Sequence, residues 1–503
     1  MTSSKTLSLL LLPVGIIAAV VLVLLSETGG FNMAVFISVA TVVTVAALSS
    51  LEFGIMALIF IASIDGFLKG LSPGWHTQLL KDYLLAVCLL RWAWLSVLGH
   101  RRNSMRHPLS LPILLFAGWC VMQLFNARSA SPILGLAGLR VWILWLPLFF
   151  VVYDYCRSRQ QIERLILFIV VLLIPISIYG IYQYKFGLGH LHGLSSGFDV
   201  YTYSRYATED YQLETRPPAT MISAHGFAST LVMVILIGIG GVPYFRNRRT
   251  WQGVLILGLP LFGTALLLTA VRNAYGSLVM ALLFLMGLIR RPDLAILTAI
   301  VGLIAVTQVG SLTGGNAMNR LNSIVTSPEY TQRRIMRPWQ NAIRWAGQHP
   351  LGGGVAGGAI GRGRMLWGVV SIRDYGPEHL MPWAENDYAR SMIELGIPGF
   401  LLFVWMLYSV GRTALRAYRA AAESRDRWLL AGMLSAVVSM YFRLLVGPAL
   451  YGWPEAIIFW CYAAMAARLP EIEAVERHRR EAEMAEVPVA KMVPEDFVLR
   501  RRG

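Results

Sequence analysis

Long uninterrupted apolar runs recur from one end of this 503-residue chain to the other. Each is about 17–22 residues long, which is enough for a helix to cross the apolar core of a bilayer. The composition agrees, with 56% apolar residues and a mean hydropathy of +0.57. Backbone groups inside a bilayer must be satisfied within the segment, so such runs favour helices. The sequence therefore predicts an all-α integral membrane protein with about 12–14 transmembrane helices. We place them near residues 6–26, 31–49, 51–68, 80–97, 109–126, 133–153, 163–183, 221–243, 252–270, 274–289, 294–311, 393–411, 428–445 and 450–467.

Arginine placement predicts the orientation in the membrane. With the N-terminus inside, the short connections on the inner side carry sixteen arginines and no lysine. The opposite short connections carry only Lys69, Lys81, Arg128 and Arg272. Cytoplasmic loops are enriched in such residues, so both termini are expected in the cytoplasm. The basic excess forms no block interleaved with aromatic residues, so a nucleic-acid partner is not expected.

Two long polar connections divide the chain. We expect eleven spans in residues 1–311 with an outer loop at 184–220, then a large outer loop at 312–392 containing short amphipathic helices. The C-terminal spans follow in 393–467 and a cytoplasmic tail in 468–503. The first run is expected to be a retained span, because it is too long for a signal peptide.

Within the larger loop, residues 333–350 have helical periodicity. Their apolar positions form one stripe, which indicates an amphipathic helix at the outer membrane surface. The stripe comprises Ile335, Met336, Trp339, Ala342, Ile343 and Ala346. The glycine-rich segment 352–363 that follows could leave backbone amides open to a ligand, although it is not a P-loop. The four cysteines show no metal-ligand spacing and are expected to be free thiols.

Several arginines lie at or near the outer ends of spans, where charge is costly unless it is paired or binds a ligand. Arg272 is the sharpest case because its turn is short and otherwise apolar. Snorkelling to head groups or pairing with a carboxylate is the alternative there, and lipid or solvent contact is the default for the loop arginines. A lipid-linked diphosphate would match the planar guanidinium fork. The candidate diphosphate-binding residues are Arg216, Arg272, Arg320, Arg334 and Arg337.

Other charges near span ends have structural interpretations. Arg390 and Glu394 are spaced to pair on one helix face. Asp65 with Lys69, and Arg443 with Glu455, are also expected to form structural ion pairs. His349 is expected to cap a helix end.

Four motifs, in this order, resemble the superfamily of bacterial O-antigen ligases and O-antigen polymerases. They are RPPATMISAHGFAS (216–229) before a span, TAVRNAYG (269–276) at a turn, QHPLGGG (348–354) after the loop helix, and ENDYARSMIELGIPG (385–399) before a later span. The similarity extends over about residues 80–410. The sequence differs at one position, because Glu385 stands where the family often has a histidine.

The resemblance implies a glycosyltransferase of the bacterial inner membrane that works on the periplasmic face. Its donor would be a glycan on undecaprenyl diphosphate, transferred with inversion and without a metal or other cofactor. By analogy with the family histidine, Glu385 becomes the candidate base for the acceptor hydroxyl, with Asp387 as a competitor and Arg216 and Arg272 as diphosphate clamps. A helix N-terminal carboxylate is the structural alternative for Glu385.

Three functions remain open. We favour a polymerase that joins repeat units of exopolysaccharide or O-antigen, since Glu385 departs from the ligase-like signature. The first alternative is an O-antigen ligase that transfers glycan to lipid A-core or protein. The second is a flippase for lipid-linked oligosaccharide, which would need polar groups along a path through the bilayer. The expected partners are the lipid-linked donor, membrane lipids, and a chain-length regulator or other polysaccharide-assembly proteins.

Overall fold

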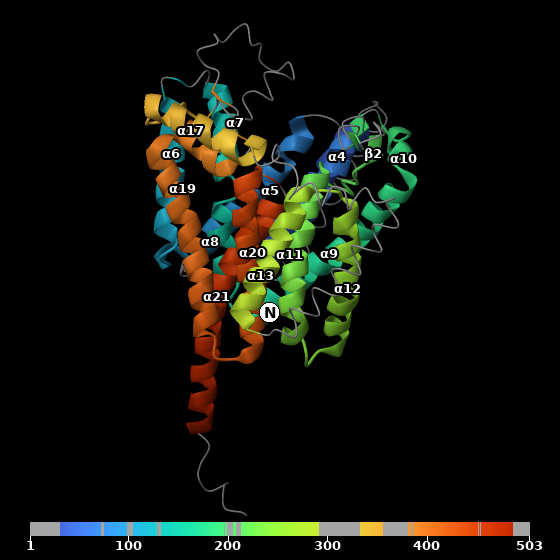
Figure 1. Ribbon diagram of the computed structural model, residues 1–503. Coiled ribbons are helices and arrows are strands. Elements are labelled where there is room, and N and C mark those ends of the chain that lie inside the picture. The colour runs from blue at the N-terminus through green and yellow to red at the C-terminus, as the bar shows by residue number, and fades with distance from the viewer. Residues whose placement is uncertain are drawn as a thin grey trace, which may run out of the picture.

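The computed structural model is a bundle of helices (Figure 1). It describes residues 31–71, 75–97, 104–126, 128, 132–195, 197–198, 205–207, 213–290, 332–355, 381–382, 384, 386–450, 452 and 454–485. The helices are α2 (Phe31–Ser49), α3 (Leu51–Ser63), α4 (Asp65–Leu71), α5 (Trp75–Val97), α6 (Ser110–Met122), α7 (Pro132–Ile143), α8 (Pro147–Tyr155), α9 (Arg159–Phe186), α10 (Gly189–His192), α11 (Ala224–Tyr244), α12 (Arg249–Leu268), α13 (Arg272–Ile289), α17 (Arg337–Gln348), α19 (Asp387–Ala420), α20 (Ser424–Val446) and α21 (Glu455–Ala485). A small antiparallel hairpin of β1 (Arg205–Ala207) and β2 (Leu213–Thr215) lies in the 184–220 connection, where no strand is predicted.

The class of an all-α integral membrane protein is confirmed. Within the described residues, seven helical segments are long and apolar enough to cross a membrane. Helices α3 and α4 would count as an eighth span if taken together. The chain bends by 61° between them, so the predicted span 51–68 is a broken helix. The seven are Gly135–Tyr155, Arg159–Phe186, Ala224–Tyr244, Arg249–Leu268, Arg272–Ile289, Asp387–Ala420 and Ser424–Val446.

The predicted total of 12–14 spans stays a prediction. The spans expected at 6–26 and 294–311 lie outside the described residues. Those expected at 31–49, 80–97, 109–126 and 450–467 correspond to helices α2, α5, α6 and α21, which are not among the seven.

Helices α11 and α20 form the centre of the bundle (Figure 1). In α11 and α20, 83% and 78% of the most apolar 18-residue stretch is buried inside the protein, against 33% in α12 and 28% in α13. Small residues allow the close approach of α11 and α20. A Cβ atom on Gly240 would lie 2.5 Å from the carbonyl oxygen of Trp428 and 3.1 Å from the Cα of Gly432. Close backbone approach at small residues is how helices associate where lipid removes the hydrophobic driving force.

Two helices run beyond their predicted ends. Helix α19 begins at Asp387 rather than 393 and continues to Ala420, through a kink at Gly396. Helix α21 is continuous from Glu455 to Ala485, so the predicted boundary at 468 falls inside a helix. Both helices carry charged residues beyond their apolar part, where water or ion pairs satisfy the side chains.

Expected ion pairs near helix ends are present. Lys69 Nζ lies 2.8 Å from Asp65 Oδ2, and Arg443 Nη2 lies 3.9 Å from Glu455 Oε1. Asp65 has a second partner that the sequence did not predict. The buried Lys81 places its Nζ 2.6 Å from Asp65 Oδ1. The four cysteines are free, as expected, and all four are buried within the protein.

Candidate active site

The start of α19 carries a cluster of buried polar side chains. Asn386 caps the helix, with its side-chain oxygen accepting a hydrogen bond from the Ala389 amide at 2.6 Å. Such a cap satisfies one of the amides that a helix start leaves without a partner. Asp387, Arg390 and Glu394 follow on one face and are each 1–3% exposed.

Arg390 holds two carboxylates of its own helix. Its Nε donates to Glu394 Oε1 at 2.9 Å, and its Nη1 lies 3.4 Å from Asp387 Oδ1. The predicted pair of Arg390 and Glu394 is therefore confirmed. Trp142 completes the arrangement, because its indole Nε1 donates to Glu394 Oε2 at 2.7 Å and its ring lies 4.6 Å below the guanidinium of Arg390. Buried charges persist only when they are paired and hydrogen-bonded in this way.

Asp387 also anchors the connection between α20 and α21. Its Oδ2 accepts hydrogen bonds from the amides of Ala449, at 2.8 Å, and Leu450, at 3.2 Å. Both carboxylate oxygens therefore have partners within the protein. This arrangement makes Asp387 well suited to position its surroundings and leaves it little access to a substrate.

The TAVRNAYG motif reaches the same connection from another side. Arg272 is the first residue of α13, and its neighbour Asn273 donates from Nδ2 to the carbonyl oxygen of Val446 at 3.2 Å. Asn273 and Asp387 thus hold residues only three positions apart in the sequence. Two motifs more than a hundred residues apart meet at the segment 446–450.

A backbone seam joins the QHPLGGG motif to α19. The amides of Gly353 and Gly354 donate to the carbonyl oxygens of Ile393 and Glu394, each at 3.0 Å, and the amide of Ile397 donates to Pro350 at 2.8 Å. The expectation that this segment offers free amides is wrong for Gly353 and Gly354. Residues 356–363 lie outside the described part of the chain.

Two glycines make the seam possible. Gly352 and Gly396 have φ values of +84° and +72°, which other residues rarely adopt. A Cβ atom on Gly396 would lie 2.4 Å from the carbonyl carbon of Leu351, and one on Gly352 would lie 2.4 Å from the amide nitrogen of Gly396. One glycine of each motif, Gly352 and Gly396, therefore serves the contact between backbones.

Helix α6 and the turn that follows it hold the same seam through side chains. Trp119 donates from Nε1 to Leu395 O at 2.8 Å, and Gln123 donates from Nε2 to Leu351 O at 3.0 Å. Asn126 Nδ2 lies 3.2 Å from Gly352 O. The sequence analysis missed these residues and Trp142, because a tryptophan or amide in an apolar run carries no signal of a contact more than two hundred residues away.

The predicted loop helix is present as α17, which packs against α19. Its buried face is Pro338, Ala342 and Ala346. The predicted stripe is divided, since Ala342 and Ala346 pack inside the protein while Met336 and Ile343 are 55% and 62% exposed. These two residues are free to contact lipid, which suits a helix at a membrane surface. His349 follows α17, and its ring packs edge-on against Trp345 with centroids 4.3 Å apart.

The candidate residues lie mostly at one end of the bundle, which we call the α17 end; it carries α17 and the starts of α11, α13 and α19 (Figure 1). Arg216 is partly buried eight residues before α11, Arg272 begins α13, and Arg337 is exposed at the start of α17. Arg320, Glu385 and the side chain of Arg334 lie outside the described residues. In the part of the chain that the structure describes, no group of three or more His, Cys, Asp or Glu side chains could hold a metal ion.

Fold and site together define a polytopic helical membrane protein with a buried charged cluster at the α17 end. Residues 257–404 match the family model of the O-antigen ligase. This match confirms the resemblance to the O-antigen ligase and polymerase superfamily and indicates an enzyme that transfers glycosyl groups. No curated protein matches the chain.

Proposed function

We propose that this protein is a membrane glycosyltransferase that joins lipid-linked repeat units into exopolysaccharide or O-antigen. One observation carries the proposal. The family match at 257–404 includes the two candidate carboxylates and every candidate arginine except Arg216. The same segment contributes three elements of the site, namely the start of α13, helix α17 and the start of α19.

The proposed donor is a glycan on undecaprenyl diphosphate, bound at the periplasmic face of the inner membrane. A diphosphate needs cations at head-group depth, and the arginines at or near the starts of α11 and α13 lie at the α17 end. The positive-inside pattern supports a periplasmic position for this end. Preplaced guanidinium groups stabilise the charge that develops on a departing diphosphate.

In the proposed reaction, Glu385 removes the proton of the acceptor hydroxyl. The oxygen then attacks the anomeric carbon, a new C–O bond forms with inversion, and the bond to the diphosphate oxygen breaks. Glu385 keeps the proton, and Arg216 and Arg272 stabilise the negative charge of the diphosphate leaving group. Neither step needs a metal ion.

The partners of Asp387 support the choice of Glu385 as the base, because both oxygens of Asp387 are already bound within the protein. Glu385 directly precedes Asn386 and Asp387, whose side chains are fixed by hydrogen bonds to the amides of Ala389, Ala449 and Leu450. Asp387 is then a positioning residue.

A ligase is the second candidate, favoured by the name of the matching family model. The decisive experiment mixes purified protein with lipid-linked repeat units, with and without lipid A-core. A ladder of products supports the polymerase, and a single shifted lipid A-core species supports the ligase. Translocation in vesicles without any glycosidic product would contradict both and support a flippase.

A further inference from the structure

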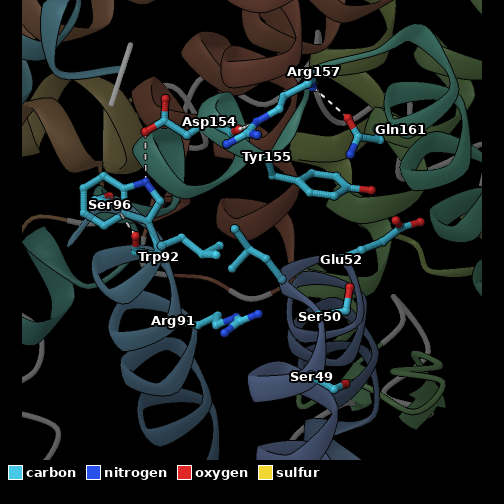
Figure 2. Close-up of a pocket in the computed structure, with 12 residues that line it drawn as sticks. Ser49, Ser50, Glu52, Arg91, Trp92, Ser96, Asp154, Tyr155, Arg157 and Gln161 are labelled. Atoms are coloured by element: carbon cyan, nitrogen blue, oxygen red, sulfur yellow. Dashed lines mark hydrogen bonds between the residues drawn. The ribbon is translucent and has the colours of Figure 1, made fainter. Parts of the chain in front are cut away.

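A polar cavity lies at the end of the bundle opposite the α17 end. It has a volume of about 320 Å³ and opens between the start of α3, the last turns of α5, the end of α8 and the first turn of α9 (Figure 2). Its lining residues are mostly polar or charged. They include Ser50, Arg91, Trp92, Asp154, Arg157 and Gln161.

Arg91 supplies a cation for which the described residues offer no partner. Its Nε is buried and makes no hydrogen bond within the described ranges, and no ion pair of Arg91 is found there. Figure 2 shows the side chain extending from α5 toward Ser50. Ser50 directly precedes α3, and its hydroxyl makes no capping hydrogen bond to that helix. A guanidinium at this depth is costly unless an anion joins it.

The acidic residues of the cavity already have partners. Asp154 accepts hydrogen bonds from the indole nitrogen of Trp92 at 2.9 Å and from the hydroxyl of Ser104 at 2.6 Å. Glu52 pairs with Arg164 at 2.9 Å. The lining itself carries two carboxylates and two arginines, Arg91 and Arg157. Because Arg164, outside the lining, neutralises Glu52, the cavity and this neighbour together keep one excess positive charge. The cavity therefore suits an anion that can accept several hydrogen bonds.

We propose that this cavity binds a phosphate group, either the head group of an anionic phospholipid or a free phosphate compound. Arg91 would bind the phosphate oxygens through its planar fork, with Arg157 at the rim and the Ser50 hydroxyl as a further donor. The first turn of α3 also lines the cavity, so the positive end of this helix dipole lies in the same region. The site is separate from the charged cluster at the α17 end, so it does not depend on the proposed reaction.

Calorimetric titration of the full chain in detergent micelles tests the proposal with three probes: phosphatidylglycerol, phosphatidylcholine and inorganic phosphate. We expect phosphatidylglycerol to bind at least tenfold more tightly than phosphatidylcholine. Arg91→Gln should weaken the binding of the anionic probe at least tenfold. Arg106→Gln removes the same charge from an exposed position on the same end that does not line the cavity, and it should change the affinity less than twofold.

Competition between the probes identifies the source of the phosphate. Displacement of phosphatidylglycerol by millimolar inorganic phosphate assigns the site to the phosphate group alone, and failure to displace it assigns the site to a lipid. If Arg91→Gln does not fold, the exposed Arg157→Gln takes its place, with an expected threefold loss of affinity. Wild-type affinity for both anionic probes in the variant that is tested, or equal losses in that variant and Arg106→Gln, would overturn the proposal.

Discussion

Two charged networks lie at opposite ends of this bundle, and they differ in burial. At the α17 end, Asp387, Arg390 and Glu394 are 1–3% exposed and bind one another, Trp142 and a backbone connection. At the opposite end, Arg159 contacts Glu423, Asp426 and Glu476 at 2.7–3.0 Å. There only Arg159 and Asp426 are buried, while the side chains of Glu423 and Glu476 are 30% and 35% exposed.

This difference in burial separates a network that ties helices together from one that lies near the proposed base. The network of Arg159 ties α9, the turn before α20 and the extension of α21, which is a structural task that partial exposure permits. The network of Arg390 keeps three charges away from water, at a cost of several kcal/mol per ion that pairing must offset. Its three charged residues lie within the segment that matches the family, two to nine positions after Glu385. A buried, hydrogen-bonded start of α19 is what the proposed role of Glu385 as a base would require.

The largest expected effect comes from Glu385→Gln. We expect the rate of glycan transfer to fall about 10²–10⁴-fold, because a glutamine cannot accept the proton of the acceptor. Binding of the lipid-linked donor should stay within a few-fold of wild type. Single-turnover assays with purified protein, together with donor titration, measure both quantities. The matched change at the opposite end, Glu476→Gln, should leave transfer unchanged; wild-type turnover in Glu385→Gln would remove this residue from the mechanism.

Removing the central arginine of each network tests the comparison directly. Arg390→Met leaves two buried carboxylates without their cation and should lower the free energy of unfolding by about 3–5 kcal/mol. Arg159→Met should cost less, about 1–2 kcal/mol, because water reaches Glu423 and Glu476 and Arg425 stays near Asp426. Denaturant unfolding in detergent gives both values. Equal losses would show that burial does not distinguish the two ends.

Gly396→Ala tests the seam beside the buried network. Its φ of +72° and the backbone 2.4 Å from the new Cβ should cost about 2–4 kcal/mol and displace the start of α19. Transfer activity should fall as well, because Glu385 lies near that start. The control is Gly263→Ala on α12, where a Cβ would meet open space. It should be neutral or stabilising by up to about 1 kcal/mol, and a neutral Gly396→Ala would contradict the seam.

The smallest effect concerns acid. Hydrogen bonding to Arg159 lowers the pKa of Glu423 from its usual 4.5 to about 2. Since the folded state favours the ionised form of Glu423, this carboxylate contributes fully to the free energy of unfolding above pH 4.5. The contribution is lost as the pH falls toward 2. The stability difference between wild type and Glu423→Gln should therefore shrink over that range in thermal unfolding scans. A difference independent of pH would show that this carboxylate is not held by Arg159.

The pattern along the chain was enough to predict the class of the fold. Apolar runs of bilayer length predict membrane helices because each span satisfies its own backbone, so the signal is local. The pairs of Asp65 with Lys69 and of Arg390 with Glu394 were predictable for the same reason, since one helical turn separates the partners. The order of the four motifs indicated the family before any contact was known.

Only the tertiary structure decided how these motifs meet. It assigns Gly352 and Gly396 to one backbone seam, and it shows Asp387 bound to amides 62 and 63 residues further on. It also brings Trp142 to Glu394 across 252 residues. Hydrogen bonds between distant segments depend on how the helices pack. Since packing among lipid-exposed helices is set by shape and small residues rather than by a hydrophobic pattern, the sequence alone carries no local signal of it.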